Sequence, residues 1–147
     1  MGLSKAKIIA GEAGVDLTVQ FNPKELQVDK TVSWTAKNSH KEDPKQEFKE
    51  PQSSSLSVTL YFDGYEQGSD VYSGPVKQLE KTARMVASLG RPPMVKFVWG
   101  SFVFEGVTES VSQKYTMFLS NGNPCRAEVA FKMKSATAAE VSAKPEG

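Results

Sequence analysis

The residues that could do chemistry in this chain are few and far apart. There is one histidine, His40, and one cysteine, Cys125. Nucleophilic catalysis needs a nucleophile, a base and a third group that orients the base, whereas Ser39 and His40 are only neighbours in sequence. Cys125 occupies the apolar row of an alternating segment, which is typical of a small buried side chain. The sequence predicts a protein that is not an enzyme and has no catalytic residues.

Metal ions and cofactors are not expected either. Zinc sites need several cysteine or histidine ligands, and one of each is too few. The stretch DGYEQGSD, Asp63 to Asp70, holds three carboxylates, but it lacks the regularly spaced ligands and the bidentate glutamate of a calcium loop. We interpret it as a solvated turn. Neither GXGXXG nor a P-loop, the glycine patterns that cradle phosphates, occurs in the chain.

Composition narrows the class of protein. The 147 residues, 39% hydrophobic and 24% charged, fit one ordinary globular domain. The net charge of +1 creates no strong field toward nucleic acid or anionic membrane. No apolar run approaches the roughly 18 residues of a membrane helix, so no direct membrane insertion is expected. A single cysteine excludes an internal disulfide and fits synthesis in a reducing cytoplasm.

Four lysines, Lys37, Lys41, Lys45 and Lys49, recur at every fourth residue. Nucleic-acid binding would need such a basic stripe together with exposed aromatic residues. Acidic residues between the lysines cancel their charge, however, and Pro44 would interrupt a helix that aligned them. We therefore expect a solvated charged surface and no nucleic-acid partner.

Alternating apolar and polar residues predict a mainly β protein. The segments DLTVQFNP and LQVDKTVSWTAK are expected to be two strands joined as a hairpin around Asn22–Glu25. Further strands are predicted from SLSVTLYFDGY, MVKFVW, SFVFEGVTESVSQKYTMF and PCRAEVAFKMK. The expected fold class is a mostly antiparallel β-sandwich or barrel with one α-helix.

The single helix is predicted from about Pro75 to Leu89. Its apolar residues follow the spacing of one helical face, Pro75 suits the first turn, and Gly90 is a natural C-cap. A long polar loop, Asn38–Ser55, comes earlier in the chain and has a length that is usually functional. The β domain is expected to span residues 1–134, with 135–147 as a flexible tail or the beginning of a linker.

The stretch RPPMVKFVWGSFVFEGVTESV, Arg91 to Val111, is unusual because both faces of its strands carry large apolar residues. An antiparallel strand with one solvated face should alternate apolar and polar residues. A large exposed apolar patch is rare on a monomer. Either a second sheet of the same chain covers the second face, or neighbouring chains do.

An ordered set of motifs resembles the tube-like baseplate proteins of contractile injection systems, the phage-tail-related particles that puncture membranes. VQFNPKEL is similar to the family's FNP turn, which is followed by a long strand to an aromatic residue, here Trp34. LSVTLYFDGYE is similar to a family strand that ends in FFDTYE. RPPMVKFVWGSFVFEGV, followed by YTMF and GNPCRA, is similar to RPP-x-V-x-F-x-WG-x-F-x-F-x-G-V with YT-x-F and G-x-P-x-RA. The resemblance covers roughly Ala6 to Lys134.

This resemblance implies a phage-tail-tube-like fold of two curved antiparallel sheets with one helix. Copies would form a six-fold ring around a central channel. The ring would be an adaptor in the inner baseplate that joins the trimeric spike to the tube, without catalytic activity. Its expected partners are other copies of itself, the spike protein, tube or tube-initiator proteins and other baseplate components. The whole particle would be made in the bacterial cytoplasm and then released or anchored.

Contacts between subunits or between layers are expected at three places: the Asn22 hairpin, the WGSF segment and the long loop, whose anchor would be Phe48. The residues singled out are Phe21, Asn22, Pro23, Trp34, Phe48, Trp99 and Phe102.

Two other functions stay open. One is the main inner tube or tube-initiator subunit, which stacks in layers instead of forming a single ring. The other is a monomeric β-barrel with Trp34 and Trp99 lining a cavity for a small ligand.

Many relatives continue through a linker into a LysM module. The last residues here, ATAAEVSAKPEG, are similar to the beginning of such a linker, so the chain either lacks the module or is shortened.

Overall fold

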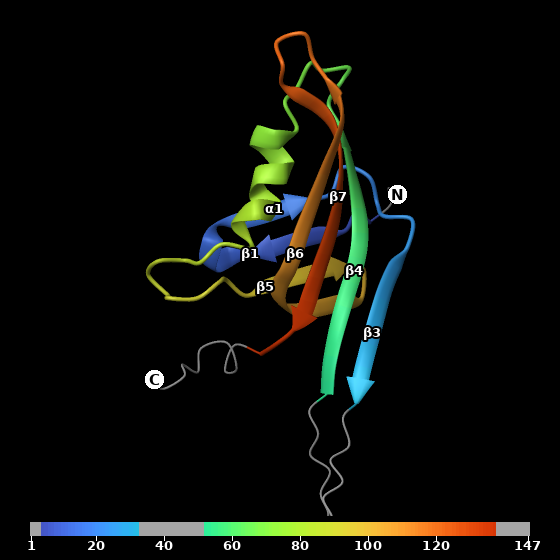
Figure 1. Cartoon of the computed structure of the whole chain (residues 1–147). Coiled ribbons are helices and arrows are strands. Elements are labelled where there is room, and N and C mark those ends of the chain that lie inside the picture. The colour runs from blue at the N-terminus through green and yellow to red at the C-terminus, as the bar shows by residue number, and fades with distance from the viewer. Residues whose placement is uncertain (1–3, 33–51, 138–147) are drawn as a thin grey trace, which may run out of the picture.

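The described part of the chain folds into seven strands, two short helical turns and one α-helix. The computed structural model describes residues 4–32 and 52–137. The elements are β1 (Lys7–Ala10), η1 (Gly11–Ala13), β2 (Val15–Thr18), β3 (Leu26–Val32), β4 (Gln52–Asp63), η2 (Tyr72–Val76), α1 (Lys77–Lys81), β5 (Val95–Trp99), β6 (Phe102–Phe118) and β7 (Pro124–Ser135). All seven strands belong to one antiparallel sheet in the order β2-β1-β5-β6-β7-β4-β3 (Figure 1). The predicted fold class, mainly β and antiparallel with one helix, is confirmed.

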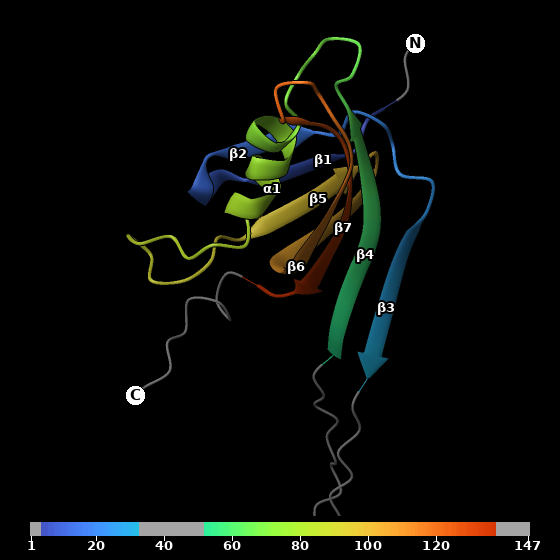
Figure 2. The same ribbon diagram turned by 45° about the horizontal axis from the view of Figure 1, so that its top comes forward.

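The sheet is continuous, and it bends instead of dividing into two. β6 pairs with β5 over Phe102–Gly106 and with β7 from Gly106 to Phe118, so it belongs to both halves. In Figures 1 and 2 the short strands β1, β2 and β5 run across the long strands β4 and β7. The two sheets that the resemblance implied are therefore joined by hydrogen bonds into one.

The predicted hairpin around Asn22–Glu25 is wrong. β2 pairs with β1 across the η1 turn, where Gly14 adopts a φ of 71°, and β3 pairs with β4. β2 and β3 lie at opposite ends of the strand order. Alternation of apolar and polar residues identifies a strand and its buried face, but it does not show which strand lies beside it. The prediction paired β2 with β3 because they are neighbours in sequence, and this assumption was wrong.

The helix is shorter than the predicted Pro75–Leu89. The π-helical turn η2 leads into α1, which ends at Lys81. The next residue, Thr82, donates its hydroxyl hydrogen bond to the Leu79 carbonyl at 2.6 Å, and its oxygen lies 2.8 Å from the hydroxyl oxygen of Thr108 on β6. Such a side chain competes with the backbone for a helical acceptor. Thr82 therefore ends the helix and ties its end to the sheet.

Gly90 has the left-handed backbone conformation expected of a helix C-cap, but it lies in a separate turn after the helix. Its φ is 69°, and its N–H donates to the carbonyl of Val86 at 2.9 Å. Val86 in turn forms an isolated antiparallel bridge with Arg91. The apolar spacing that predicted a longer helix thus falls within a turn.

The predicted long loop, Asn38–Ser55, extends too far at its C-terminal boundary. β4 begins at Gln52, so the boundary of Asn38–Ser55 lies four residues too late. Ser53 and Ser55 pair with Thr31 and Asp29 of β3. A run of serines has a low intrinsic preference for strands, and pairing with β3 overrides it. The rest of that loop lies outside the described residues.

The core lies on one face of β4 and β7, where every second side chain is buried. Val76 and Leu79 from η2 and α1 cover this face and are fully buried. Cys125 is buried and free, in the row where the sequence predicted it. The buried apolar residues of the two strands are Leu56, Val58, Leu60, Phe62, Cys125, Ala127, Val129, Phe131 and Met133.

The stretch Arg91–Val111 is covered by the chain itself on one face only. Val95 and Phe97 are fully buried and Phe104 nearly so, because this face looks into the subunit's own core. On the opposite face Val103 is 55% exposed. The subunit alone thus leaves part of this apolar surface uncovered.

Candidate assembly interface

Four long strands form a ribbon, β6-β7-β4-β3, whose two outer edges have no strand partner within residues 4–32 and 52–137. β3 has β4 on one side only. β5 covers the edge of β6 from Phe102 to Gly106, and no described strand lies along that edge from Val107 to Phe118. Unpaired N–H and C=O groups along a strand edge are a template for another strand. The ribbon therefore offers two pairing edges on opposite sides of the subunit.

The remaining sheet edge, β2, has a different character. It is four residues long, and Asp16 forms an exposed ion pair with Lys7 of β1 at 3.5 Å. Short, charged edge strands are a common protection against unwanted pairing. Among the strands described, the ribbon edges are the better candidates for contact with another chain.

β3 also exposes apolar side chains on the face that looks toward the core. Leu26 pairs with Val58 and Val28 pairs with Leu56, and these β4 partners are buried. Val28 is nevertheless 42% exposed and Val32 49% exposed, because the core does not extend as far as the edge strand. The apolar strip of β3, which we define as Val28 and Val32, is left without cover by the subunit.

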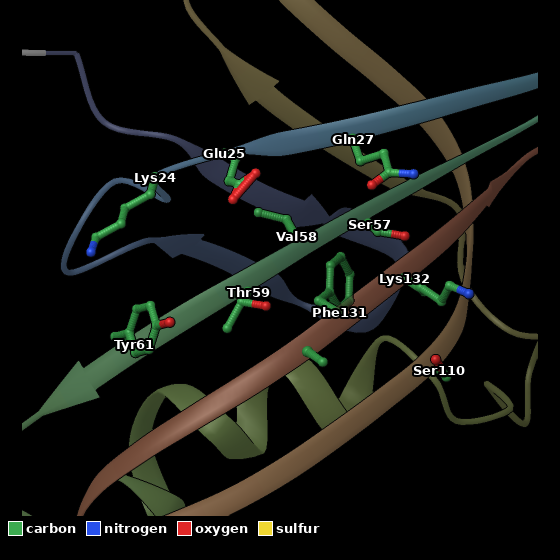
Figure 3. A pocket seen from close by; sticks show the side chains of 11 residues that line it. Lys24, Glu25, Gln27, Ser57, Val58, Thr59, Tyr61, Ser110, Phe131 and Lys132 are labelled. Carbon is green, nitrogen blue, oxygen red and sulfur yellow. The ribbon is translucent and has the colours of Figure 1, made fainter.

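The other face of the ribbon is polar. Small hydroxyl residues alternate along β4 and β6, and lysines stand on β7. A groove of about 410 Å³ lies on this face (Figure 3). The residues that line it are Lys24, Glu25, Gln27, Ser57, Val58, Thr59, Tyr61, Ser110, Ala130, Phe131 and Lys132. Trp99 is not among them, so this groove is not the ligand cavity of the barrel alternative.

One end of the ribbon carries exposed aromatic side chains. Phe21 is 47%, Tyr65 51% and Phe118 58% exposed. Phe21 and Tyr65 both line a second groove, of about 260 Å³. Phe118 pairs with Pro124 at the start of β7, and the loop that holds Tyr65 follows β4 at the same end. We call Phe21, Tyr65 and Phe118 the aromatic end.

Polar contacts hold this end together. The side-chain amide of Gln20 accepts from the Asp63 N–H at 2.8 Å and donates to the Asp63 carbonyl at 2.9 Å. The Asp63 carboxylate accepts from the Tyr65 N–H at 3.0 Å and pairs with Arg126 at 3.1 Å. The Tyr65 hydrogen bond first, and Arg126 second, lower the pKa of Asp63. The aromatic end is therefore presented on a fixed scaffold.

Some of the predicted contact residues are exposed, and others are buried or hydrogen-bonded within the subunit. Phe21 is exposed, as a contact residue should be. Pro23 is buried. Asn22 accepts from the Ala6 N–H and donates to the Ser4 carbonyl, both at 3.0 Å, so it holds the N-terminal segment in place.

The WGSF segment is also partly used within the subunit. Trp99 donates its indole N–H to the Ser4 carbonyl at 3.2 Å. Phe102 packs edge-on against Phe97, with ring centroids 6.2 Å apart. Both residues are half-buried, so only part of each side chain is open to a partner. Trp34 and Phe48 lie outside the described residues, and the contact role of all seven residues stays a prediction.

Sequence reasoning did not single out the apolar strip of β3. Val28 and Val32 stand in the same alternating row as Leu26, and the row looks the same whether or not the core reaches it. The signal that could have helped is the charged Lys30 between the two valines, because a lysine rarely lies in a fully buried row.

The described part of the chain has no site for a metal ion and no membrane helix. The cysteine and the acidic side chains within residues 4–32 and 52–137 form no group of three that could hold a metal, and His40 lies outside the described residues. None of the helices within residues 4–32 and 52–137 is long and apolar enough to cross a membrane.

Comparison with known proteins identifies the family of the chain and a solved structure with a similar fold. No curated protein matches the chain. One similar solved structure, "Tail of empty GTA particle computed with helical refinement, C6 symmetry", has a TM-score of 0.50 and 15% sequence identity over 92% of each chain. A second, "Virion of native gene transfer agent (GTA) particle", has a TM-score of 0.45 and 16% identity, also over 92% of each chain. The family model of the contractile injection system tube protein matches residues 3–144. The chain belongs to the contractile injection system tube protein family.

Proposed function

We propose that copies of this chain join side by side into a closed ring in the inner baseplate of a contractile injection system, where the ring connects the spike to the tube. The observation that carries the proposal is that two edges of the ribbon β6-β7-β4-β3 pair with no strand in the described part of the chain. One edge is β3, and the other is β6 from Val107 to Phe118. Two different, complementary edges on opposite sides of a subunit are what a head-to-tail ring requires.

The strand directions favour the same arrangement. Each neighbouring pair in the ribbon is antiparallel, so β3 runs opposite to β6. When the β6 edge of one copy lies beside β3 of the next, the new pair is antiparallel as well. The ribbons can therefore join into one continuous antiparallel sheet, which removes both exposed edges.

The two faces of the ribbon suit two different environments. In the ring, the polar face with the serine, threonine and lysine side chains would line the central channel. The core face, which α1 covers, would look outward. A similar solved structure is described with C6 symmetry, and six copies of a four-stranded ribbon would close a sheet of about 24 strands, wide enough for an open channel.

The aromatic end supports contact with another layer. Phe21, Tyr65 and Phe118 are exposed at the ends of strands that would run along the channel. Aromatic residues are enriched in protein interfaces because they combine large apolar area with few rotatable bonds. We assign this end to contact with the next layer of the particle, which is the spike or the tube.

A second candidate function is the main inner tube or tube-initiator subunit. The family model itself is that of a tube protein, and a ribbon with two pairing edges suits a stacked tube as well as a single ring. Neither candidate needs catalysis, a cofactor or a metal ion.

Copy number separates a single ring from a stacked main tube. We expect about two copies of this chain per spike polypeptide in purified particles, the ratio of one hexamer to one trimer. Quantitative mass spectrometry of intact particles, with isotope-labelled peptides of both proteins, measures this ratio. A ratio many times higher would identify a stacked tube, and complete absence of the chain from particles would refute both candidates.

A further inference from the structure

A projecting arm, residues 83–90, follows α1. Every residue of the arm except Val86 is exposed. Met85 is 67% exposed, the highest value among the large apolar residues described, and Leu89 is 40% exposed. In Figures 1 and 2 the arm reaches out from the body on the side away from β3. These apolar side chains are therefore largely exposed to solvent and add little to the packing of the subunit's own core.

The base of the arm is nevertheless firmly held. Val86 donates its N–H to the Arg91 carbonyl at 2.9 Å, which closes the arm. The guanidinium of Arg91 binds both carboxylate oxygens of Glu12, at 2.9 and 3.0 Å. Glu12 also accepts from the Met94 N–H at 2.9 Å. The hydrogen bond from Arg91, followed by that from Met94, lowers the pKa of Glu12 to about 2.

This clamp gives the arm a defined position before any partner binds. A bidentate pair between arginine and a carboxylate is geometrically specific, and a pre-ordered loop loses less entropy on binding than a mobile one. The arm therefore has two properties of a binding element, exposed apolar side chains and a fixed base.

The arm also starts at the level of the apolar strip of β3. Thr82, just before the arm, touches Thr108 of β6 through its hydroxyl. Thr108 pairs with Met133, Met133 with Leu56, and Leu56 with Val28. Thr82 and Val28 thus stand at the same row of the ribbon, on its core face, at opposite sides. A subunit cannot bring its own arm to its own strip.

We propose that the arm of one copy packs on the next copy of this chain, with Met85 and Leu89 covering Val28 and Val32 of its β3. The inference rests on the proposed ring, in which β3 of one copy lies beside the β6 edge of its neighbour. The arm lies on the β6 side and on the core face, so it extends over the neighbour's β3. The contact covers apolar residues on both sides and supports the strand junction with side-chain packing.

A cysteine cross-link tests the contact. The chain's one cysteine is buried, so the double variant Met85→Cys, Val28→Cys presents two new reactive thiols. Particles that carry this variant in place of the wild type are treated with a short bis-maleimide and run on a denaturing gel. We expect a ladder of cross-linked chains that ends at the ring size. The matched control is Met85→Cys, Val103→Cys, because Val103 is exposed and lies on another face; it should give no ladder.

The experiment distinguishes failure of the arm contact from failure of the proposed ring. If the particles assemble with the expected copy number but the Met85→Cys, Val28→Cys ladder does not exceed the control, the arm contact is refuted and the ring stands. Cross-links from the Met85→Cys thiol to the spike or tube protein, identified by mass spectrometry, would assign the arm to another layer and overturn the inference. If the chain enters no particle, the inference falls together with the ring.

Discussion

Val28→Asp is expected to stop ring assembly while the subunit stays folded. Val28 is 42% exposed on β3, so a carboxylate at this position keeps much of its hydration in the free subunit. Asp has a low preference for strands, so we expect the free energy of unfolding to fall by about 1 kcal/mol. The folded subunit should therefore be obtained in normal yield.

In the ring the same carboxylate would be buried without a partner. An uncompensated buried charge costs about 3–5 kcal/mol, which is enough to weaken each contact between subunits more than about 100-fold. A closed ring repeats this penalty at every junction. Particles should therefore lose the chain, or fail to form, while circular dichroism and a cooperative thermal transition show that the isolated variant is folded.

Val103→Asp is the matched control. It introduces the same charge in place of the same residue type at a position that is 55% exposed, but Val103 lies in the β5–β6 part of the sheet, away from both ribbon edges. We expect normal particles from this variant. Normal particles from Val28→Asp as well would mean that β3 is not covered in the assembly.

Gly106→Ala is expected to have the largest effect on folding. Gly106 pairs with Val95 of β5 and with Ser135 of β7, so it marks the point where β6 changes partners. A Cβ atom there would lie 1.9 Å from the carbonyl oxygen of Lys134 and 2.8 Å from the Cα of Ser135. Both neighbours are backbone atoms of β7 and cannot move aside without breaking the pairing.

We expect Gly106→Ala to lower the free energy of unfolding by at least about 3 kcal/mol, the upper end of the usual penalty for an overfilled site. Urea denaturation of the purified variant measures the change, and loss of soluble protein would be the extreme form. Gly11→Ala is the control, because a Cβ at Gly11 meets nothing within 4 Å. A Gly106→Ala variant as stable as Gly11→Ala would contradict the close approach of β6 and β7.

The long strands could be predicted well from the sequence. Leu56, Val58, Leu60 and Phe62 alternate with polar residues, and all four are buried. A period of two follows directly from strand geometry, so it identifies both the strand and its buried face. The motifs over most of the chain pointed to the family that the family model identifies.

The pairing and the helix end depend on contacts between distant residues. Nothing local shows that β2 turns back on β1, or that Thr82 meets Thr108 across 26 positions of sequence. The predicted helix is too long because the 3.6-residue period describes a possible helix, whereas the contact of Thr82 with Leu79 and Thr108 ends the actual helix at Lys81. Single-sequence patterns carry no information about such partners.

The surfaces that we propose for assembly overlap only in part with the residues singled out from the sequence, whose contact role stays a prediction. Phe21 is exposed, but Trp99 and Asn22 both donate to the Ser4 carbonyl, and Asn22 also accepts from the Ala6 N–H. The apolar strip of β3 and the arm were missed, because hydrophobic residues look alike in sequence whether they face a core or a neighbour. Exposure on the folded subunit is what separates the two cases.

A reconstruction of the assembled particle by electron microscopy would show whether two different edges of one ribbon meet between neighbouring copies. We expect density in which β3 of one copy pairs antiparallel with β6 of the next, between Val107 and Phe118, around a channel lined by the polar face. Copies whose β3 and β6 edges both face solvent, or which meet through β2, would contradict this arrangement.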